Sequence, residues 1–379
     1  MELIKTKILF DGVSEQKDSF VGIEKNNIKY VGKEKPPGRH EIIYECGALT
    51  PSFIDAHSHI GMVRSGEPSD EEESNEHLDS VFPLVNALHS VYMDDPSFKE
   101  SVESGILYSV VLPGSGNIIG GKAVLLKNYV SNIKDAFISD VGVKTALGYN
   151  PRSTEKWKGN RPSTRMGSIA LLRDYLLKAQ KATKLVKMKK KVREELEPLT
   201  EIFIDILSGK NKLMVHVHKE DDIMILLDLV NEFKIKAIAN HLCDVYNESV
   251  FSMLRSFSIP IIYGPLDSFP YKVELKHESW RNVEKLIKSK AKFALMSDHP
   301  VILQRNLFYG LRHLLRFGLS RSEAISKITR EPAEIIEAKK LGHISPGYTA
   351  SLTLWNGDPF LMSSYPKTVI AEGKIVYNE

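Results

Sequence analysis

The segment PSFIDAHSHI, residues 51–60, places two histidines one residue apart directly after an apolar stretch. Side chains of a β-strand alternate between its two faces, so His57 and His59 should point the same way at the end of a short buried strand. Neutral imidazole is a preferred ligand of zinc, and two imidazoles on one face can share one ion. The alternative is a chance His-x-His pair on a solvated strand edge.

Other polar residues of the same kinds follow other apolar, strand-like runs. KLMVHVHKED contains His216 and His218, KAIANHL contains His241, and FALMSDHP contains Asp298. Lys144 lies inside the run VGVKTALG. A single histidine at a strand end is more simply explained as a hydrogen-bonded loop residue. Four strand ends that all supply His or Asp instead indicate a nitrogen and oxygen ligand set suited to zinc or a similar divalent ion.

These runs belong to a longer alternation of apolar strand-like and helical segments. The strand-like runs span residues 53–57, 106–112, 123–127, 141–147, 213–217, 236–240, 259–264 and 292–297. Eight of them predict an α/β fold, a (β/α)8 TIM-like barrel over residues 50–347, whose chemistry takes place at the carboxyl ends of the strands. The candidate ligands would then meet at one end of the barrel.

The two ends of the chain have a different pattern. Residues 1–49 and 348–379 show short alternating runs with turn residues between them, such as LIKTKILF and SLTLWNG. This pattern is typical of antiparallel sheet, and neither end is long enough to form a stable sheet alone. We therefore expect the two ends to meet and form one small β-sandwich domain beside the barrel.

Composition narrows the classes of partner. The 379 residues, 42% of them apolar, can bury a large core. The 51 basic and 48 acidic side chains give a formal charge of +3, which provides no electrostatic footprint for nucleic acid or a membrane surface. The start MELIKTKILFDG lacks a signal-peptide pattern, no apolar run approaches the roughly 20 residues of a membrane span, and two cysteines suggest no disulfide framework. The sequence predicts a cytoplasmic protein.

With these motifs the chain resembles the amidohydrolase superfamily over nearly its whole length. The resemblance rests on DAHSH, VHVHK, ANHL and SDHP, and on the C-terminal ITREPAEIIEAKKLGHISPGYTASLTLWNGDPF and VIAEGKIVY. Within the superfamily the chain is most similar to the imidazolonepropionase-related branch, through VVLPGSGNIIGG, VKTALGYNP, RPSTRMG and SDHPVI. The resemblance implies a metal-dependent hydrolase that cleaves a C–N bond of a cyclic amide or a peptide-like amide.

The resemblance also implies a metal ligand set, residue by residue. His57 and His59 match the ligand pair of the first barrel strand. His216 matches the ligand of the fifth strand, with His218 as the fallback. The sixth and eighth strands supply His241 and Asp298. Zinc is the expected ion.

Lys144 decides whether one or two ions are expected per chain. In members with two metals, a lysine of the fourth strand carboxylated by carbon dioxide bridges the ions, and Lys144 lies on a strand that suits this role. A lysine that faces the substrate or the buried end of the barrel is the alternative. Both stay open.

The implied mechanism is hydrolysis by a metal-bound hydroxide, because a divalent ion lowers the pKa of its water toward about 7. Asp298 is the expected general acid/base, and His241, if it is not a ligand, the group that polarises the scissile carbonyl. Two alternatives remain: an aminohydrolase (deaminase) acting on a heterocycle, and a non-catalytic scaffold protein of the same fold. The spacing of Glu220 from His216 fits the deaminase pattern poorly, and the complete ligand set argues against a scaffold.

Three arginines, Arg152, Arg161 and Arg165, follow the fourth strand-like run. Arginine binds carboxylates in a bidentate manner, so these residues are candidate contacts to an anionic small-molecule substrate. Ordinary surface arginines are the alternative.

A long helix is predicted from Thr164 to about Glu195, with eight Lys or Arg residues and no acidic residue in 178–193. A solvated helix face explains this charge best, although the basic stretch could also dock an acidic partner. The acidic stretch Asp70–Glu73 could fold over the site or meet the basic stretch in a neighbouring subunit. We expect a homo-oligomer.

Overall fold

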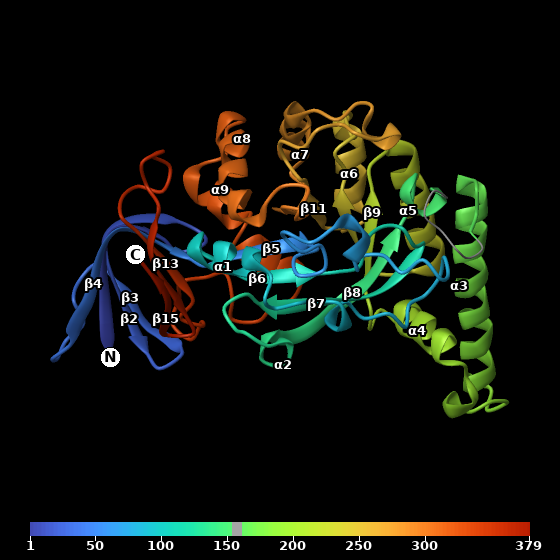
Figure 1. Ribbon diagram of the computed structural model, residues 1–379, viewed down its shortest axis with the longest axis horizontal. Helices are drawn as coiled ribbons and strands as arrows, with labels where there is room; N and C mark the ends of the chain where they lie inside the picture. The colour runs from blue at the N-terminus through green and yellow to red at the C-terminus, as the bar shows by residue number, and fades with distance from the viewer. Residues whose placement is uncertain (154–160) are drawn as a thin grey trace.

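The computed structural model describes residues 1–153 and 161–379 and consists of a barrel and a separate side sheet (Figure 1). The barrel sheet has eight strands, in the order β12-β11-β10-β9-β8-β7-β6-β5. The strands are β5 (Phe53–Ser58), β6 (Ile106–Val111), β7 (Ile119–Lys127), β8 (Phe137–Ala146), β9 (Leu213–Val217), β10 (Ala237–His241), β11 (Ile261–Tyr263) and β12 (Phe293–Leu295). Each of the eight predicted runs therefore contains a strand, and the predicted barrel is confirmed.

One strand departs from a regular barrel of this kind. β7 runs antiparallel to both β6 and β8, whereas the pairs β5–β6 and β8 through β12 are parallel. Only residues 112–118 connect β6 to β7, too few for the crossover helix that a parallel strand needs. The β7–β8 connection holds only the one-turn helix α2 (Ile133–Ala136). The alternation of strands and helices holds from β8 onward.

Backbone hydrogen bonds join the first and last barrel strands where the candidate ligands lie. The N–H of Asp298 donates to the carbonyl of His57 at 3.1 Å, and the N–H of His59 donates to the carbonyl of His299 at 2.9 Å. The residues that follow β5 and β12 are thus held in a fixed relation to each other.

Helices cover the outside of the barrel. They are α1 (Pro96–Glu103), α3 (Arg165–Lys187), α4 (Pro198–Leu207), α5 (Glu220–Phe233), α6 (Glu248–Ser256), α7 (Val283–Ser289), α8 (Leu311–Arg316), α9 (Arg321–Ser326) and α10 (Arg330–Ile335). Apolar helix faces, for example Ile223 and Leu226 of α5, pack in one core with strand residues such as Val215. A second core that includes Ile54, Met214 and Ile238 contains strand residues of the alternate face. In the part of the chain that the structure describes, no helix is long and apolar enough to cross a membrane.

The long helix predicted to reach about Glu195 ends earlier. α3 begins after Thr164, whose side chain accepts a hydrogen bond from the N–H of Gly167, and ends at Lys187. The chain turns at Lys189, which has a φ of 56°. A continued helix would place Lys187 beside Lys190 and Lys191 on the next turn, and like charges at this spacing destabilise a helix. The basic stretch is exposed, as is the acidic stretch around η1 (Ser69–Glu71), and their predicted contact between subunits stays a prediction.

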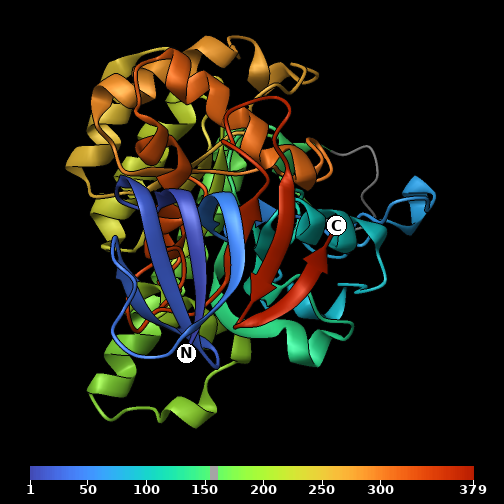
Figure 2. The ribbon, with the colours of Figure 1, turned by 90° about the vertical axis from the view of Figure 1, so that its left-hand side faces the viewer.

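Both chain ends form one seven-stranded sheet, in the order β15-β14-β13-β4-β1-β2-β3 (Figure 2). Its strands are β1 (Glu2–Phe10), β2 (Glu15–Glu24), β3 (Asn27–Gly32), β4 (Glu41–Pro51), β13 (Leu352–Trp355), β14 (Pro366–Ala371) and β15 (Lys374–Asn378). β4 joins the two ends, because it pairs in parallel with β1 and antiparallel with β13. Residues from both ends, including Ile4, Leu49 and Leu352, share one core. The predicted side domain from the two chain ends is confirmed.

Candidate metal centre

The predicted ligands from four strand ends converge at one end of the barrel. The ring centroid of His241 lies 4.7 Å from that of His57, 4.4 Å from that of His216 and 4.9 Å from that of His218. Two triplets have their ligand atoms within 4.8 Å of one another: His57, His241 and Asp298 form one, and His216, His218 and His241 form the other. The two triplets share His241, so the cluster is continuous.

Asp298 joins this cluster to the pair from β5. Its Oδ1 lies 3.4 Å from Nε2 of both His57 and His59. The side chains of His59 and Asp298 are 13% and 12% exposed, whereas those of His57 and His241 are almost completely buried. The cluster therefore meets solvent at His59 and Asp298, and a small molecule would approach from that side.

Unusual backbone conformations set the direction of two of these side chains. His241 ends β10 with a φ of 78°, and Asp298 has a φ of 53°. Strand alternation alone would turn Asn240 into the barrel and His241 outward. Such conformations are uncommon outside glycine and cost on the order of 1–3 kcal/mol, and they gather at functional sites. At this end of β10 the chain presents both Asn240 and His241 to the cluster.

Fixed hydrogen bonds orient the rings of three histidines. Nδ1 of His57 lies 2.9 Å from Oδ1 of Asn240, whose own amide nitrogen donates to the carbonyl of Ile238. Because this oxygen only accepts, His57 carries its proton on Nδ1 and keeps the lone pair of Nε2 for a metal.

The same arrangement occurs at the other two rings. Nδ1 of His59 lies 2.8 Å from the carbonyl oxygen of Leu112, and Nδ1 of His241 lies 3.1 Å from that of Gly264. Backbone carbonyls only accept hydrogen bonds, so Nε2 is the free ligand atom of each ring.

His216 in β9 and His218 directly after it have buried nitrogens without hydrogen-bond partners among the described residues. Among the described residues, neither nitrogen of His218 nor Nδ1 of His216 has a hydrogen-bond partner. A buried polar atom without a partner costs about 1–3 kcal/mol, a cost that coordination of a cation removes. The residues present therefore fit a divalent ion. His216 and His218 are two positions apart and face the cluster together, so both remain candidate ligands.

The protonation states also suit metal binding. Burial lowers the pKa of His57, His218 and His241 well below its usual value, and burial together with Lys272 lowers that of His216 to about 4. These imidazoles are neutral at pH 7, the form that binds metals. Burial would raise the pKa of Asp298, but the contacts of its carboxylate with His59 and His57 and the charge of Lys144 hold it below its usual range.

Lys144 lies beside the first triplet, on the side of its ligand atoms. It is completely buried on β8, and its Nζ lies 3.4 Å from Nε2 of His57. Burial lowers the pKa of Lys144 to about 7. The structure thus brings the predicted bridging lysine to the cluster.

The three arginines predicted to bind substrate follow β8, and each of them contacts another part of the protein. Arg152 donates to the carbonyl of Gly148 at 2.8 Å, and Arg161 donates to those of Gly116 and Asn150. Arg165 donates to Asp222 at 3.2 Å. Their role in binding a substrate stays a prediction.

Sequence reasoning missed two charged residues of the site, Lys272 and Glu274. They lie in the long connection after β11, where Nζ of Lys272 contacts Oε1 of Glu274 at 2.8 Å. The same oxygen lies 3.1 Å from Nε2 of His216. This connection contains no recognisable motif, and Glu274 lies well beyond the end of β11.

A buried polar network behind the ligands was also missed. Asp55 is fully buried and accepts hydrogen bonds from the backbone N–H and the hydroxyl of Ser297, from Gln304 and from the N–H of His57. Gln304 begins η7 (Gln304–Gly310). Asp55 thus ties Ser297, the residue before Asp298, to His57, the first residue of the ligand pair.

Comparison with known proteins shows the family of the chain. The profile of the amidohydrolase family matches residues 159–376. Amidohydrolase tasK of Hapsidospora irregularis is 24% identical over 371 residues, which cover 89% of this chain and 37% of that protein, so the chain spans little more than a third of that relative. A crystal structure of an amidohydrolase from Thermotoga maritima matches the whole of both chains at 30% identity with a TM-score of 0.92. A prolidase complexed with N-methylphosphonate-L-proline, at 13% identity over the whole of both chains and a TM-score of 0.63, shares the fold. The chain belongs to the amidohydrolase family.

Proposed function

We propose that this protein is a metal-dependent hydrolase that cleaves the C–N bond of a cyclic amide or a peptide-like amide, with zinc as the ion. Family membership supports hydrolysis. The observation that carries the metal is the cluster of neutral histidines with unpartnered nitrogens around an ionised Asp298.

The cluster residues would hold the ion, and one of them, Asp298, would also carry a proton. His57, His59 and Asp298 would hold one ion, and His241 with His216 or His218 would complete the site or hold a second ion. A bound divalent ion lowers the pKa of water from 15.7 toward about 7, which supplies a hydroxide nucleophile at neutral pH.

Asp298 is suited to carry the proton. Its ionised carboxylate lies on the side of the cluster that meets solvent, where it can take a proton from the attacking water and return it to the leaving nitrogen. His241 presents the lone pair of Nε2, which suits a ligand, and it would polarise the scissile carbonyl only with a proton on Nε2.

The substrate is proposed to be small and anionic at one end. Solved structures of similar fold include a prolidase with a phosphonate derivative of proline and a Xaa-Pro dipeptidase with bound methionine, so dipeptides and N-acyl amino acids come first. The sequence resemblance to imidazolonepropionases adds cyclic amides to the same panel.

The deaminase alternative has weaker support. Glu220, the acidic residue nearest in sequence to the β9 histidines, accepts hydrogen bonds from the backbone N–H groups of Tyr246 and Asn247. It thus stabilises the connection after β10. The complete ligand cluster likewise speaks against a non-catalytic scaffold.

Elemental analysis of the purified protein, followed by the substrate panel with zinc-loaded enzyme, tests the proposal. We expect at least one divalent ion per chain and C–N bond hydrolysis of a panel member. If the protein neither contains nor takes up a divalent ion, the proposal of a metal-dependent hydrolase is refuted. The matched control is a His57→Ala/His59→Ala double variant, which should lose both metal and activity.

A further inference from the structure

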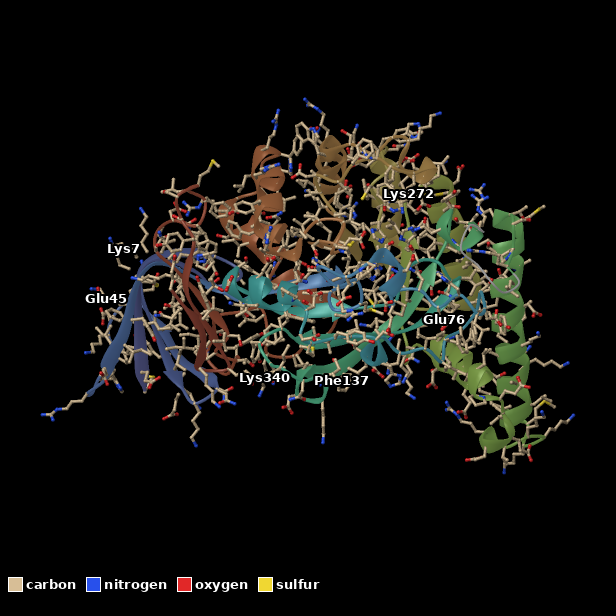
Figure 3. All side chains as sticks on the ribbon, viewed as in Figure 1. Lys7, Glu45, Glu76, Phe137, Lys272 and Lys340 are labelled. Carbon is tan, nitrogen blue, oxygen red and sulfur yellow. The ribbon has the colours of Figure 1, made fainter. Side chains whose placement is uncertain are left out.

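The connection between β11 and α7 places a carboxylate against a histidine of β9. Glu274 lies in η5 (Val273–Leu275), and its side chain is only 2% exposed. Its Oε1 lies 3.1 Å from Nε2 of His216 and 2.8 Å from Nζ of Lys272. Its Oε2 accepts the backbone N–H of Tyr149 at 3.0 Å. Figure 3 labels Lys272 in the upper part of the barrel domain, close to the junction of β9 and α5.

The loop after β8 is shaped to receive this carboxylate. At Gly148 an added Cβ would lie 2.8 Å from Oε2 of Glu274, and the φ of 88° favours glycine there. The Asn150 amide, in the orientation that satisfies its hydrogen bonds, donates to Oε1 of Glu274 at 3.2 Å and accepts from Lys272 at 3.3 Å. Three separate segments thus fix the position of the carboxylate.

These contacts assign Glu274 a holding role and not proton transfer. Four donors reach the carboxylate: His216, Lys272 and Asn150 at Oε1, and the backbone N–H of Tyr149 at Oε2. The Lys272 ammonium, 2.8 Å from Oε1, pairs with this carboxylate. Glu274 is thereby fixed as the acceptor of these contacts.

The contact determines which nitrogen of His216 faces the cluster. A carboxylate only accepts, so His216 carries its proton on Nε2, and the buried Nδ1 without a partner among the described residues keeps its lone pair. We propose that Glu274 is a positioning residue of the metal centre, which fixes the ring and tautomer of His216. A carboxylate behind a metal-bound imidazole also raises its basicity. The proposal rests on the proposed function only in that the ion binds at this cluster.

Metal affinity gives the first test. Glu274→Gln keeps the size of the side chain and removes its charge, and the zinc dissociation constant is measured by chelator competition. We expect about 10- to 100-fold weaker binding, the usual cost of losing such a partner. Glu278→Gln, a partly exposed carboxylate of the same connection, should bind zinc like the wild type. Zinc affinity of Glu274→Gln within twofold of the wild type would overturn the proposal.

The wild-type protein gives a second test that does not depend on a variant that folds. Two-bond proton–nitrogen NMR spectra of ¹⁵N-histidine-labelled metal-free protein report the tautomer of each ring, with His216 assigned from His216→Gln. We expect His216 protonated on Nε2, and His57, His59 and His241 on Nδ1. His216 protonated on Nδ1 would refute the role of Glu274. Because this spectrum needs no metal, it tests Glu274 even if zinc never binds and the proposed function fails.

Discussion

Asp298 is the residue in which position and charge combine most closely. Its backbone is hydrogen-bonded to His57, its carboxylate lies 3.4 Å from two imidazoles, and it is among the few cluster residues that meet solvent. A group that only held the metal would not need access to the substrate side. The position of Asp298 at the solvent side of the cluster therefore favours a role in proton transfer in addition to metal binding.

Asp298→Asn should therefore lose turnover more than metal. The histidines still offer ligands, but an amide cannot take up a proton, so kcat should fall by about 10²- to 10⁴-fold. Zinc content by elemental analysis and kcat on the best panel substrate give the two readouts. Full zinc content with near-normal kcat would contradict this, and His241 would be the next candidate base.

Lys144 is expected to be carboxylated when two ions bind. Its burial lowers its pKa to about 7, so much of it is an unprotonated amine, the form that adds carbon dioxide. Protein prepared with zinc and ¹³C-bicarbonate should show a carbamate NMR signal and two ions per chain. Lys144→Met should lose the signal and one ion. Two ions with no carbamate signal would show that Lys144 does not bridge them.

At the scale of residues, sequence motifs identified those candidate ligands that follow apolar strands. The sequence could predict the positions of these residues because the carboxyl ends of the barrel strands meet at one end of the barrel. They are His57, His59, His241 and Asp298. Glu274 could not, because its position depends on how a long connection folds back onto the loop after β8. A sequence pattern does not record that tertiary contact.

At the scale of elements, the junction of β5 and β12 sets the site. β12 is short, and Asp55 supplies the acceptors that bind the residues after it to β5. The ligand pair and Asp298 are therefore aligned by a buried carboxylate that touches neither substrate nor ion.

Asp55→Ala should destabilise the protein by on the order of 3 kcal/mol, because it removes the acceptor of the buried Ser297 donors and one acceptor of the Gln304 amide. Urea unfolding of the metal-free protein measures this. Asp140→Ala, which removes an exposed carboxylate of β8 paired with Lys122, is the control and should change stability by about 0.5 kcal/mol or less. Equal effects of the two changes would show that the network does not hold the junction.

The direction of β7 shows a different limit of sequence reasoning. The apolar run predicts a strand but not its direction, which depends on the connection before it. Seven residues from 112 to 118 are too few for a parallel crossover. The length of this connection, and not the pattern of the strand, therefore indicates the direction of β7.

At the scale of the whole molecule, the two chain ends depend on each other. β13 covers the edge of β4, and Leu352 and Leu354 fill the core that β1 and β4 share. Deleting residues 348–379 should expose this edge and core, and the truncated chain should aggregate or unfold. Solubility and thermal melting measure the outcome. A soluble truncated form that melts like the full chain would contradict the composite domain.

The buried imidazoles should make the metal-free protein sensitive to acid. Their pKa values are lowered on folding, to about 4 for His216 and His299, from about 6.5 in the unfolded chain. The unfolded chain then binds more protons as pH falls from about 6.5 to about 4, so stability is lost over this range.

The stability lost through the histidines at acidic pH exceeds the stability gained through Asp55, the buried carboxylate that acts in the opposite direction. At about pH 5 each of these two histidines contributes a loss of roughly 2 kcal/mol, and His57, His218 and His241 act in the same direction. Asp55, whose pKa burial raises to about 6, gains stability as pH falls but offsets less than one histidine at that pH. The free energy of unfolding from urea titrations should therefore be lower at about pH 5 than at about pH 7.5, by several kcal/mol. His218→Gln should reduce the difference, since it removes one titrating imidazole. A midpoint independent of pH would show that the histidines are not buried as neutral groups when the metal is absent.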